Sequence, residues 1–523
     1  MADEQTTTAA KRTAGQRPLR RRTLLGAGAA VLGSGALIGS APADRADAPI
    51  AAPGGAPGSI PDADQDSLEL LKRMLSFDTQ NSGQGGTTRA HAEMLRGVWQ
   101  SAGVDAQIID TPQPDNVHLL ARIMGTGQAE PMLFLGHSDV VPVEAQNWTA
   151  DPFAGEIRDG EIYGRGALDM KGANSAAISA LLRHLDEGAV FDRDIIVLTD
   201  CDEEAGSFGS KWLAATHWDE LDAGAVLTEG GWFLAGSDQR SPMLITATRQ
   251  DKVYFNLKIT AQGVATHSSK PIPEDSAVVT LSRAVSELGD WEAPVHLTEV
   301  TREYFRALAE ATEDERFAQA IRLMLEAAEQ STLERAAGVM VSRSDYPYLH
   351  RALLRTTHAF VIEEAGYKEN VIPSSAEATV NCRAVPGGQR PSEFLDQVRE
   401  LLADRDVEVS LAAPEGQSAE EHLAQLEQTW SQPPADLDDD LYRSLSAAAR
   451  RIYPEAGFAP ALFEAGTSLG PWREKGIPGY GVYPYVLSGE QLITMHGNDE
   501  RIFVEALAQG TEYMYEVFAA FRL

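Results

Sequence analysis

Two polar side chains follow a short apolar run in the first third of the chain. The run 132–135 is too short for a helix and is bounded by Gly136, so we expect a buried strand there. Residues i and i+2 of an extended chain point to the same side, so His137 and Asp139 emerge together. A metal-binding imidazole usually donates its other ring N–H to a carboxylate. The pair therefore predicts His137 as a metal ligand and Asp139 as the group that orients it, although a strand-end histidine beside a turn aspartate fits the same pattern.

Further acids and a late histidine lie at the ends of successive predicted elements. Carboxylates and imidazoles without thiolates suit zinc, or less selectively cobalt or manganese. One aspartate that bridges two metals, with two terminal ligands on each metal, accounts for the whole set. The candidate ligands are His137, Asp169, Glu204, Glu229 and His496. Each residue taken alone could be an ordinary polar residue at a strand end, but together they predict a two-metal site that activates water for hydrolysis.

Glu203 directly precedes the candidate ligand Glu204. A neighbour of a ligand is free of the metal and can still reach the water that the metal activates. We therefore predict Glu203 as the general base that accepts a proton from this water.

The elements that must position these residues alternate between strand and helix. Such alternation favours an α/β fold with a central mixed sheet, in which the loops at strand carboxyl ends carry function. The expected strands are 104–109, 118–123, 132–135, 194–199 and 225–228, and the expected helices are 66–77, 89–102, 172–185 and 210–217.

The pattern changes after about residue 245. A strand that alternates polar and apolar residues is expected at 253–259, an amphipathic helix at 275–288, and helical periodicity dominates 301–357. Strands then return before the α/β pattern resumes. The predicted organisation is a catalytic domain built from two segments, 63–245 and 413–523. Between them we expect an inserted α+β lid or dimerisation domain over 246–412, with a helical insertion at about 301–357.

The composition restricts the class of protein. The 523 residues carry a formal net charge of −33, which argues against nucleic acid as a partner because nucleic-acid binding needs clustered Lys and Arg. The two cysteines, Cys201 and Cys382, are too few for a disulfide framework and are expected to be buried free thiols.

The first 43 residues have the composition of a secretory signal. Adjacent arginines at 20–22 precede a Gly/Ala-rich apolar run that ends near Ala41-Pro-Ala43, and the arginines resemble the twin-arginine type. We expect a signal peptide over 1–43, a flexible linker over 44–62, and export to the periplasm or the extracellular space. The apolar run is short and rich in glycine, so no membrane span is expected in the mature form, with an uncleaved anchor as the alternative.

Several motifs resemble the M20 metallopeptidases, from about residue 66 to the C-terminus. Others resemble the branch of that family that contains carboxypeptidase S and the N-acyl-amino-acid hydrolases. The family motifs are Gly136-His-Ser-Asp-Val-Val-Pro142, Trp148-x4-Phe153, Tyr163-Gly-Arg-Gly-Ala-Leu-Asp-Met-Lys-Gly172, Asp202-Glu-Glu204 and the late His496. The branch motifs are Glu229-Gly-Gly, His267-Ser-Ser, Asn370-Val-Ile-Pro373 and His496-Gly-Asn-Asp-Glu500, together with the helical insertion.

The resemblance implies a distribution of the ligands between two zinc ions. By this resemblance, His137 and Glu229 bind one zinc, Glu204 and His496 bind the other, and Asp169 bridges them. His267 matches the family histidine that polarises the scissile carbonyl, often in the active site of a partner subunit, which implies a homodimer through the inserted domain.

The resemblance also implies how substrate is held. Asn370 and Arg383 match residues that bind the free carboxylate of the substrate, and a guanidinium suits that role because its planar fork meets a carboxylate with two hydrogen bonds. Gly466 matches a Gly-rich turn that lines the site. Ser468 stands where Asp is common in the family, so its role is left open.

We predict a secreted two-zinc hydrolase that cleaves an amide bond next to a free α-carboxylate, in a small peptide or an N-acyl amino acid. A two-zinc aminopeptidase uses the same ligand types, but such enzymes typically lack a large domain inserted between the fourth and fifth ligands. A catalytically inactive binding protein on the same fold is a second alternative. Loss of Glu203 or of a ligand would mark that state, and none is lost.

Overall fold

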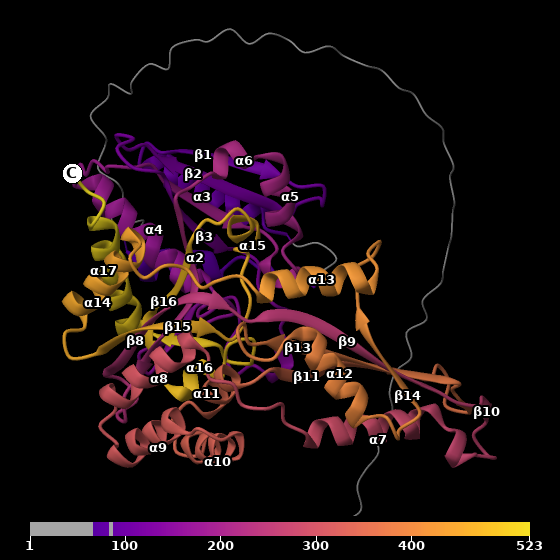
Figure 1. Ribbon diagram of the computed structural model, residues 1–523. Helices are drawn as coiled ribbons and strands as arrows, with labels where there is room; N and C mark the ends of the chain where they lie inside the picture. The colour runs from indigo at the N-terminus through magenta and orange to yellow at the C-terminus, as the bar shows by residue number, and fades with distance from the viewer. Residues whose placement is uncertain (1–65, 83–86) are drawn as a thin grey trace, which may run out of the picture. The chain divides into compact units, whose positions relative to one another are not determined.

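The computed structural model describes residues 66–82 and 87–523 (Figure 1). The predicted signal peptide 1–43 and linker 44–62 therefore lie outside the described residues. Within the described ranges, no helix combines the length and the apolar character needed to cross a membrane.

The centre of the fold is an eight-stranded mixed sheet. Its strands follow the order β1-β2-β6-β3-β7-β16-β8-β15. They are β1 (Asp105–Asp110), β2 (Val117–Ile123), β3 (Met132–His137), β6 (Ile195–Asp200), β7 (Ala225–Ala235), β8 (Pro242–Asp251), β15 (Gly457–Phe463) and β16 (Gly479–Leu487). The predicted α/β class with a central mixed sheet is confirmed.

Both faces of this sheet are covered because alternate side chains of its strands enter different cores. In β3, Met132 and Phe134 lie in one apolar cluster, whereas Leu133 and Leu135 lie in another. The first cluster is covered by α2 (Ser67–Leu75), α3 (Arg89–Ser101), α4 (Lys171–Asp186), α14 (Asp440–Ile452) and α17 (Val504–Ala519). The second is covered by α5 (Phe208–Thr216), α6 (Trp218–Leu221) and α15 (Gly470–Glu474).

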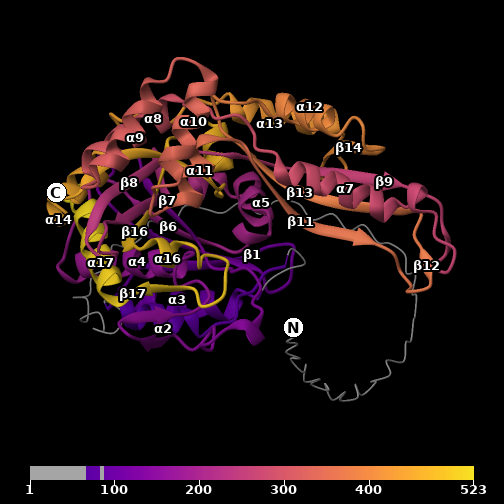
Figure 2. The same ribbon diagram turned by 90° about the horizontal axis from the view of Figure 1, so that it is seen from below.

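A second, four-stranded antiparallel sheet has its own core (Figure 2). Phe255, Leu257 and Ile259 alternate with more exposed residues and pack beneath its helices, as the sequence pattern predicts. The strand order is β11 (Thr357–Ala365), β13 (Ser375–Ala384), β9 (Val253–Gln262), β14 (Val407–Ala412), and the helices are α7 (Ala277–Asp290), α12 (Pro391–Leu401) and α13 (Ala419–Trp430).

The helices that follow α7 pack on the central sheet and share its first apolar cluster. Tyr346 fixes this contact, because its hydroxyl donates to the carbonyl oxygens of Ala235 and Leu487, each at 2.9 Å. These helices are α8 (Glu299–Ala311), α9 (Glu315–Glu326), α10 (Gln330–Val341) and α11 (Pro347–Leu354). The four-stranded sheet also has Leu426 of α13 in its core, beyond the expected limit at 412. The domain limits stay a prediction.

Short elements complete the chain. They are β4 (Glu156–Arg158), β5 (Glu161–Tyr163), β17 (Arg501–Phe503), β10 (Thr266–His267), β12 (Val371–Ile372), α16 (Gly489–Leu492) and the 3-10 helices η1 (Ala145–Asn147), η2 (Glu203–Ala205) and η3 (Pro273–Asp275). Cys201 and Cys382 are buried free thiols, as expected.

Gly510 of α17 lies against β16, where a Cβ atom would be 1.7 Å from the carbonyl oxygen of Pro484. We expect Gly510→Ala to lower the free energy of unfolding by about 1–3 kcal/mol, because the helix or the strand must shift. Gly97, in α3, has open space around the same position, so Gly97→Ala should be neutral or stabilising by up to about 1 kcal/mol. Urea unfolding of both variants measures the difference, and equal effects would show that this close approach is not required.

Candidate active site

The candidate ligands converge because the strands that carry them run in parallel. β3 pairs in parallel with β6 on one side and with β7 on the other. His137 is the last residue of β3, Glu203 and Glu204 follow β6 in η2, and Glu229 lies within β7. The carboxyl ends of such strands form the usual site in α/β sheets.

His137 presents one ring nitrogen to the other candidates. Its Nδ1 lies 2.9 Å from the backbone carbonyl oxygen of Asp139 and, since a carbonyl only accepts, Nδ1 carries the proton. Nε2 faces the other candidates, 3.0 Å from Asp169 Oδ1 and 3.7 Å from Glu229 Oε2, and is the nitrogen whose lone pair a bound metal would take. This tautomer is the one that a metal ligand requires.

The carboxylate of Asp139 is 3.6 Å from His137 Nδ1, so the expected orienting contact is made by the carbonyl of the same residue instead. The carboxylate accepts hydrogen bonds from the Asn81 side chain at 3.2 Å and from the backbone N–H of Glu203 at 3.1 Å. Asp139 therefore links the β3 end to the loop that carries Glu203.

Asp169 faces two histidines with its two oxygens. Oδ1 is 3.0 Å from His137 Nε2, and Oδ2 is 3.1 Å from His496 Nε2. His496 Nε2 also lies 3.0 Å from Glu204 Oε1. Two clusters therefore share Asp169, one with His137 and Glu229 and the other with Glu204 and His496.

The two clusters fit divalent cations because they bury more negative than positive charge. Burial raises the pKa of Glu229 to about 7, and the charge of Asp169 adds to this. Burial also raises the pKa of Glu203 well above 4.5, with further contributions from Glu229 and Glu204. Oxygen and imidazole donors of this kind suit zinc or a similar metal.

A buried ion pair supports the loop that carries Asp169. Glu500 Oε2 pairs with Arg165 Nη1 at 2.6 Å, and both side chains are almost fully buried. Glu500 Oε1 accepts the backbone N–H groups of Gly166, Leu168 and Asp169 at 2.8–3.1 Å. Neither role was predicted, although Arg165 and Glu500 both lie within quoted motifs.

Tyr483 also was not identified from the sequence. Its hydroxyl lies 2.5 Å from Glu229 Oε2 and 2.8 Å from Asp169 Oδ1, and the side chain is fully buried in β16. Its only sequence signal is an aromatic residue in a buried strand, a pattern that fits a core position equally well.

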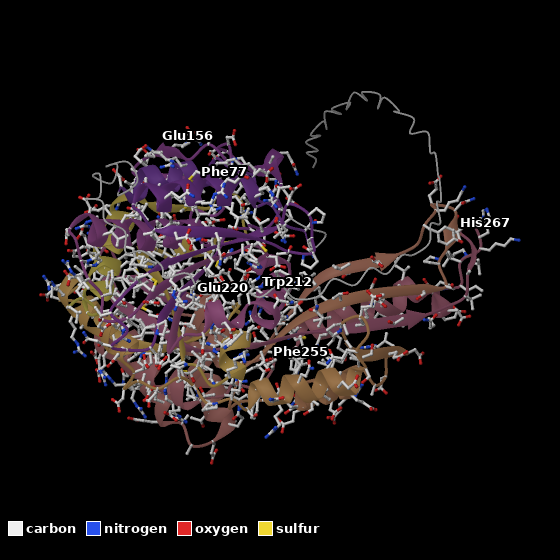
Figure 3. The ribbon with its side chains drawn as sticks, turned by 90° about the horizontal axis from the view of Figure 1, so that it is seen from above. Phe77, Glu156, Trp212, Glu220, Phe255 and His267 are labelled. Carbon is white, nitrogen blue, oxygen red and sulfur yellow. The ribbon has the colours of Figure 1, made fainter. Side chains whose placement is uncertain are left out.

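Two predicted residues lie elsewhere in this chain. His267 and Asn370 lie in or beside the small β10–β12 pair, where the Asn370 carbonyl accepts the N–H of Ser268 at 3.1 Å. Figure 3 labels His267 at the end of the inserted strands, away from the central sheet. Both residues are exposed. The structure therefore brings them close to each other and not to the ligands of their own chain.

The remaining residues singled out in the sequence are Arg383, Gly466 and Ser468. Arg383, half-buried on β13, is 5.5 Å from the ring centre of Tyr254. Gly466 lines a cavity of about 260 Å³ beside Tyr254. Ser468 is buried and donates to Asp200 Oδ2 at 2.7 Å, which fixes the residue where the family commonly has Asp.

Two clusters of carboxylate and imidazole donors at the carboxyl ends of parallel strands form an arrangement typical of metal-dependent hydrolases. Residues 133–520 match the peptidase family M20/M25/M40, so the chain belongs to this family. The family resemblance inferred from the motifs is confirmed.

Two curated relatives match most of the chain. The N-fatty-acyl-amino acid synthase/hydrolase of Homo sapiens is 27% identical over 459 residues, which cover 86% of this chain and 86% of the human protein. The probable carboxypeptidase S-like 2 of Dictyostelium discoideum is 28% identical over 396 residues, or 74% of this chain and 71% of that protein. Among solved structures, the M20 family metallo-carboxypeptidase from Sulfolobus solfataricus has a TM-score of 0.62 at 19% identity, covering 87% of this chain and 99% of that chain, and it supports the fold.

We expect Glu500→Ala to lower the free energy of unfolding by about 3–5 kcal/mol, because it leaves Arg165 buried without its partner. It should also reduce metal uptake, since the loop before Asp169 loses its acceptor. The matched control is Glu512→Ala, which breaks an exposed pair with Arg183 and should cost at most about 1 kcal/mol. Urea unfolding tests both variants, and similar costs would contradict this role of Glu500.

Proposed function

We propose that this protein is an exported two-zinc hydrolase that cleaves an amide bond next to a free α-carboxylate. Cobalt or manganese could replace zinc. The substrate is the C-terminus of a small peptide or an N-acyl amino acid. The observation that carries the proposal is the pair of ligand clusters that share Asp169. The sequence of 1–43 supports export.

The names of the two relatives support this substrate class. One refers to an N-fatty-acyl-amino acid and the other to a carboxypeptidase. An N-acyl amino acid and a peptide C-terminus share one chemical feature, an amide bond beside a free carboxylate. Release of amine from a panel of N-acyl amino acids and dipeptides tests the proposal, and cleavage of amidated and free-acid substrates at equal rates would contradict it.

The residues of this chain divide the reaction between them. When bound, two divalent cations supply Lewis-acid polarisation of a carbonyl and lower the pKa of water. Glu203 accepts a proton from the attacking water and returns it to the leaving amine. Burial raises the pKa of Glu203, so this carboxylate holds a transferred proton more readily than an exposed one would.

In this proposal the inserted domain supplies most of the substrate contacts, and Gly466 belongs to the second segment of the catalytic domain. Arg383 and Asn370 bind the free carboxylate, Gly466 lines the site, and His267 donates a hydrogen bond to the developing oxyanion. Because His267 and Asn370 lie away from the ligands of their own chain, we propose that a second copy of the chain presents them in a homodimer.

Glu203 and Glu204 are adjacent but have different proposed roles. Glu203→Ala should lower kcat by about 10²–10⁴-fold while both metals stay bound, because it removes only the base. Glu204→Ala should lose metal from the cluster that contains His496. Elemental analysis and turnover of both variants test this. The opposite pattern would mean that base and ligand are exchanged.

Arg383→Ala should cost about 2–5 kcal/mol in kcat/KM for free-acid substrates, because their carboxylate loses its partner. It should change kcat/KM little for amidated analogues, which have no charge to anchor. Arg390→Ala, which breaks an exposed pair with Glu427 on the same domain, is the matched control. A preference for acids that survives the loss of Arg383 would place the carboxylate elsewhere.

A shared active site predicts complementation between inactive variants. In a mixed dimer of His267→Ala and Glu203→Ala subunits, one site keeps both groups intact. Mixing the two proteins under exchange conditions should therefore restore roughly a quarter of wild-type activity, given random pairing of two-fold dimers. Each variant mixed with itself is the control. No recovery despite subunit exchange would rule out a role for His267 across the dimer.

A further inference from the structure

We infer that Tyr483 is a positioning residue that orients Glu229 and Asp169 for the metal bound by the His137 cluster. This inference deepens the proposed function and rests on its two-metal site. Tyr483 lies on β16, outside the family and branch motifs.

The hydroxyl of Tyr483 contacts ligand oxygens of the His137 cluster. It contacts Glu229 Oε2 at 2.5 Å and Asp169 Oδ1 at 2.8 Å. These are the same two oxygens that face His137 Nε2, at 3.7 and 3.0 Å. The other oxygen of Asp169 faces His496. A change at Tyr483 should therefore affect the His137 cluster far more than the His496 cluster.

The backbone of β16 explains how this side chain reaches the ligands. β16 pairs with β7 at Val482 and again at Val486, whereas the partners on β7, Gly231 and Phe233, are only two residues apart. The intervening residues 483–485 therefore bulge out of the ladder, and Pro484 has no N–H to contribute to it. Gly510 leaves the space that the bulge needs.

The ring of Tyr483 is held separately from its hydroxyl. Trp232 stacks on it with ring centres 4.6 Å apart and planes 7° from parallel. Trp232 is fixed in turn because its Nε1–H donates to Glu464 at 2.9 Å. β7 thus carries both the ligand Glu229 and the ring that supports Tyr483. Phenylalanine at 483 would keep the stacking and remove only the hydroxyl.

The single hydroxyl proton lies between two carboxylate oxygens that would otherwise repel each other. Groups that orient metal ligands through hydrogen bonds typically contribute about 10–100-fold to metal affinity. Loss of the Tyr483 hydroxyl should therefore weaken one metal site by this factor and leave the polypeptide fold intact.

Two ligand variants isolate the clusters for the test. His496→Ala keeps the cluster of His137, Asp169 and Glu229, and His137→Ala keeps the cluster of Asp169, Glu204 and His496. Zn²⁺ affinity is measured by competition with a chromophoric chelator, in the full chain. Tyr483→Phe should weaken binding about 10–100-fold in the His496→Ala background and less than about threefold in the His137→Ala background.

Tyr513→Phe is the matched control, because Tyr513 is also fully buried and its hydroxyl donates to the Leu445 carbonyl. It should change neither affinity, and thermal unfolding of both metal-free variants reports on folding. Equal weakening in the two backgrounds, or none in either, would overturn the role of Tyr483. If either of these outcomes is observed and the wild-type chain still binds two metals, only the role of Tyr483 is wrong and the proposed function stands. If the wild-type chain binds fewer than two, both proposals are wrong.

Discussion

The structure depends on holding several carboxylates together at one edge of a buried sheet. Asp169 and Glu229 are buried, Glu203 and Glu204 lie beside them, and the two ligand clusters contain the imidazoles of His137 and His496. Carboxylates in such a place are stable only where donors or cations compensate them. The surrounding chain therefore provides fixed donors and acceptors around the site, and the cations of the proposed mechanism would neutralise the rest.

Most of this support comes from the backbone, which cannot be rearranged by rotating a side chain. The Asp139 carbonyl fixes the His137 ring, and the N–H of Glu203 bonds the Asp139 carboxylate. The Glu500 carboxylate accepts hydrogen bonds from three backbone N–H groups of the loop that ends at Asp169. Parallel pairing of β3, β6 and β7 then sets the spacing of the ligands, so the geometry of the site is largely that of the sheet.

The sequence predicted the α/β class, His137 and Glu229 from short apolar runs, which are a local signal. The other candidate ligands, Asp169, Glu204 and His496, lie within motifs that resemble those of the family. It could not predict which oxygen orients His137, since the choice between the carbonyl and the carboxylate of Asp139 depends on how the loop turns. It also could not predict Tyr483, whose place depends on a bulge in β16 relative to β7. The place of Leu426 in the core of the second sheet was likewise not predicted, because Leu426 shares that core with residues that are distant along the chain. Register and packing between distant segments are absent from local patterns.

The junction between the two sheets helps to set the position of Arg383. β8 and β9 are joined at Lys252, which is buried and donates to the carbonyl oxygens of Ala352 and Arg355, each at 3.0 Å, and to Thr357 at 3.1 Å. Burial lowers the pKa of Lys252 to about 7, and the positive charge of Arg383 contributes to this shift. All three acceptors lie within the helical insertion at about 301–357, so the insertion fixes the start of β9. Because β13 pairs with β9, the position of Arg383 is fixed as well. The insertion therefore helps to set the position of Arg383, the residue that the proposed function assigns to the substrate carboxylate, although the insertion does not contain it.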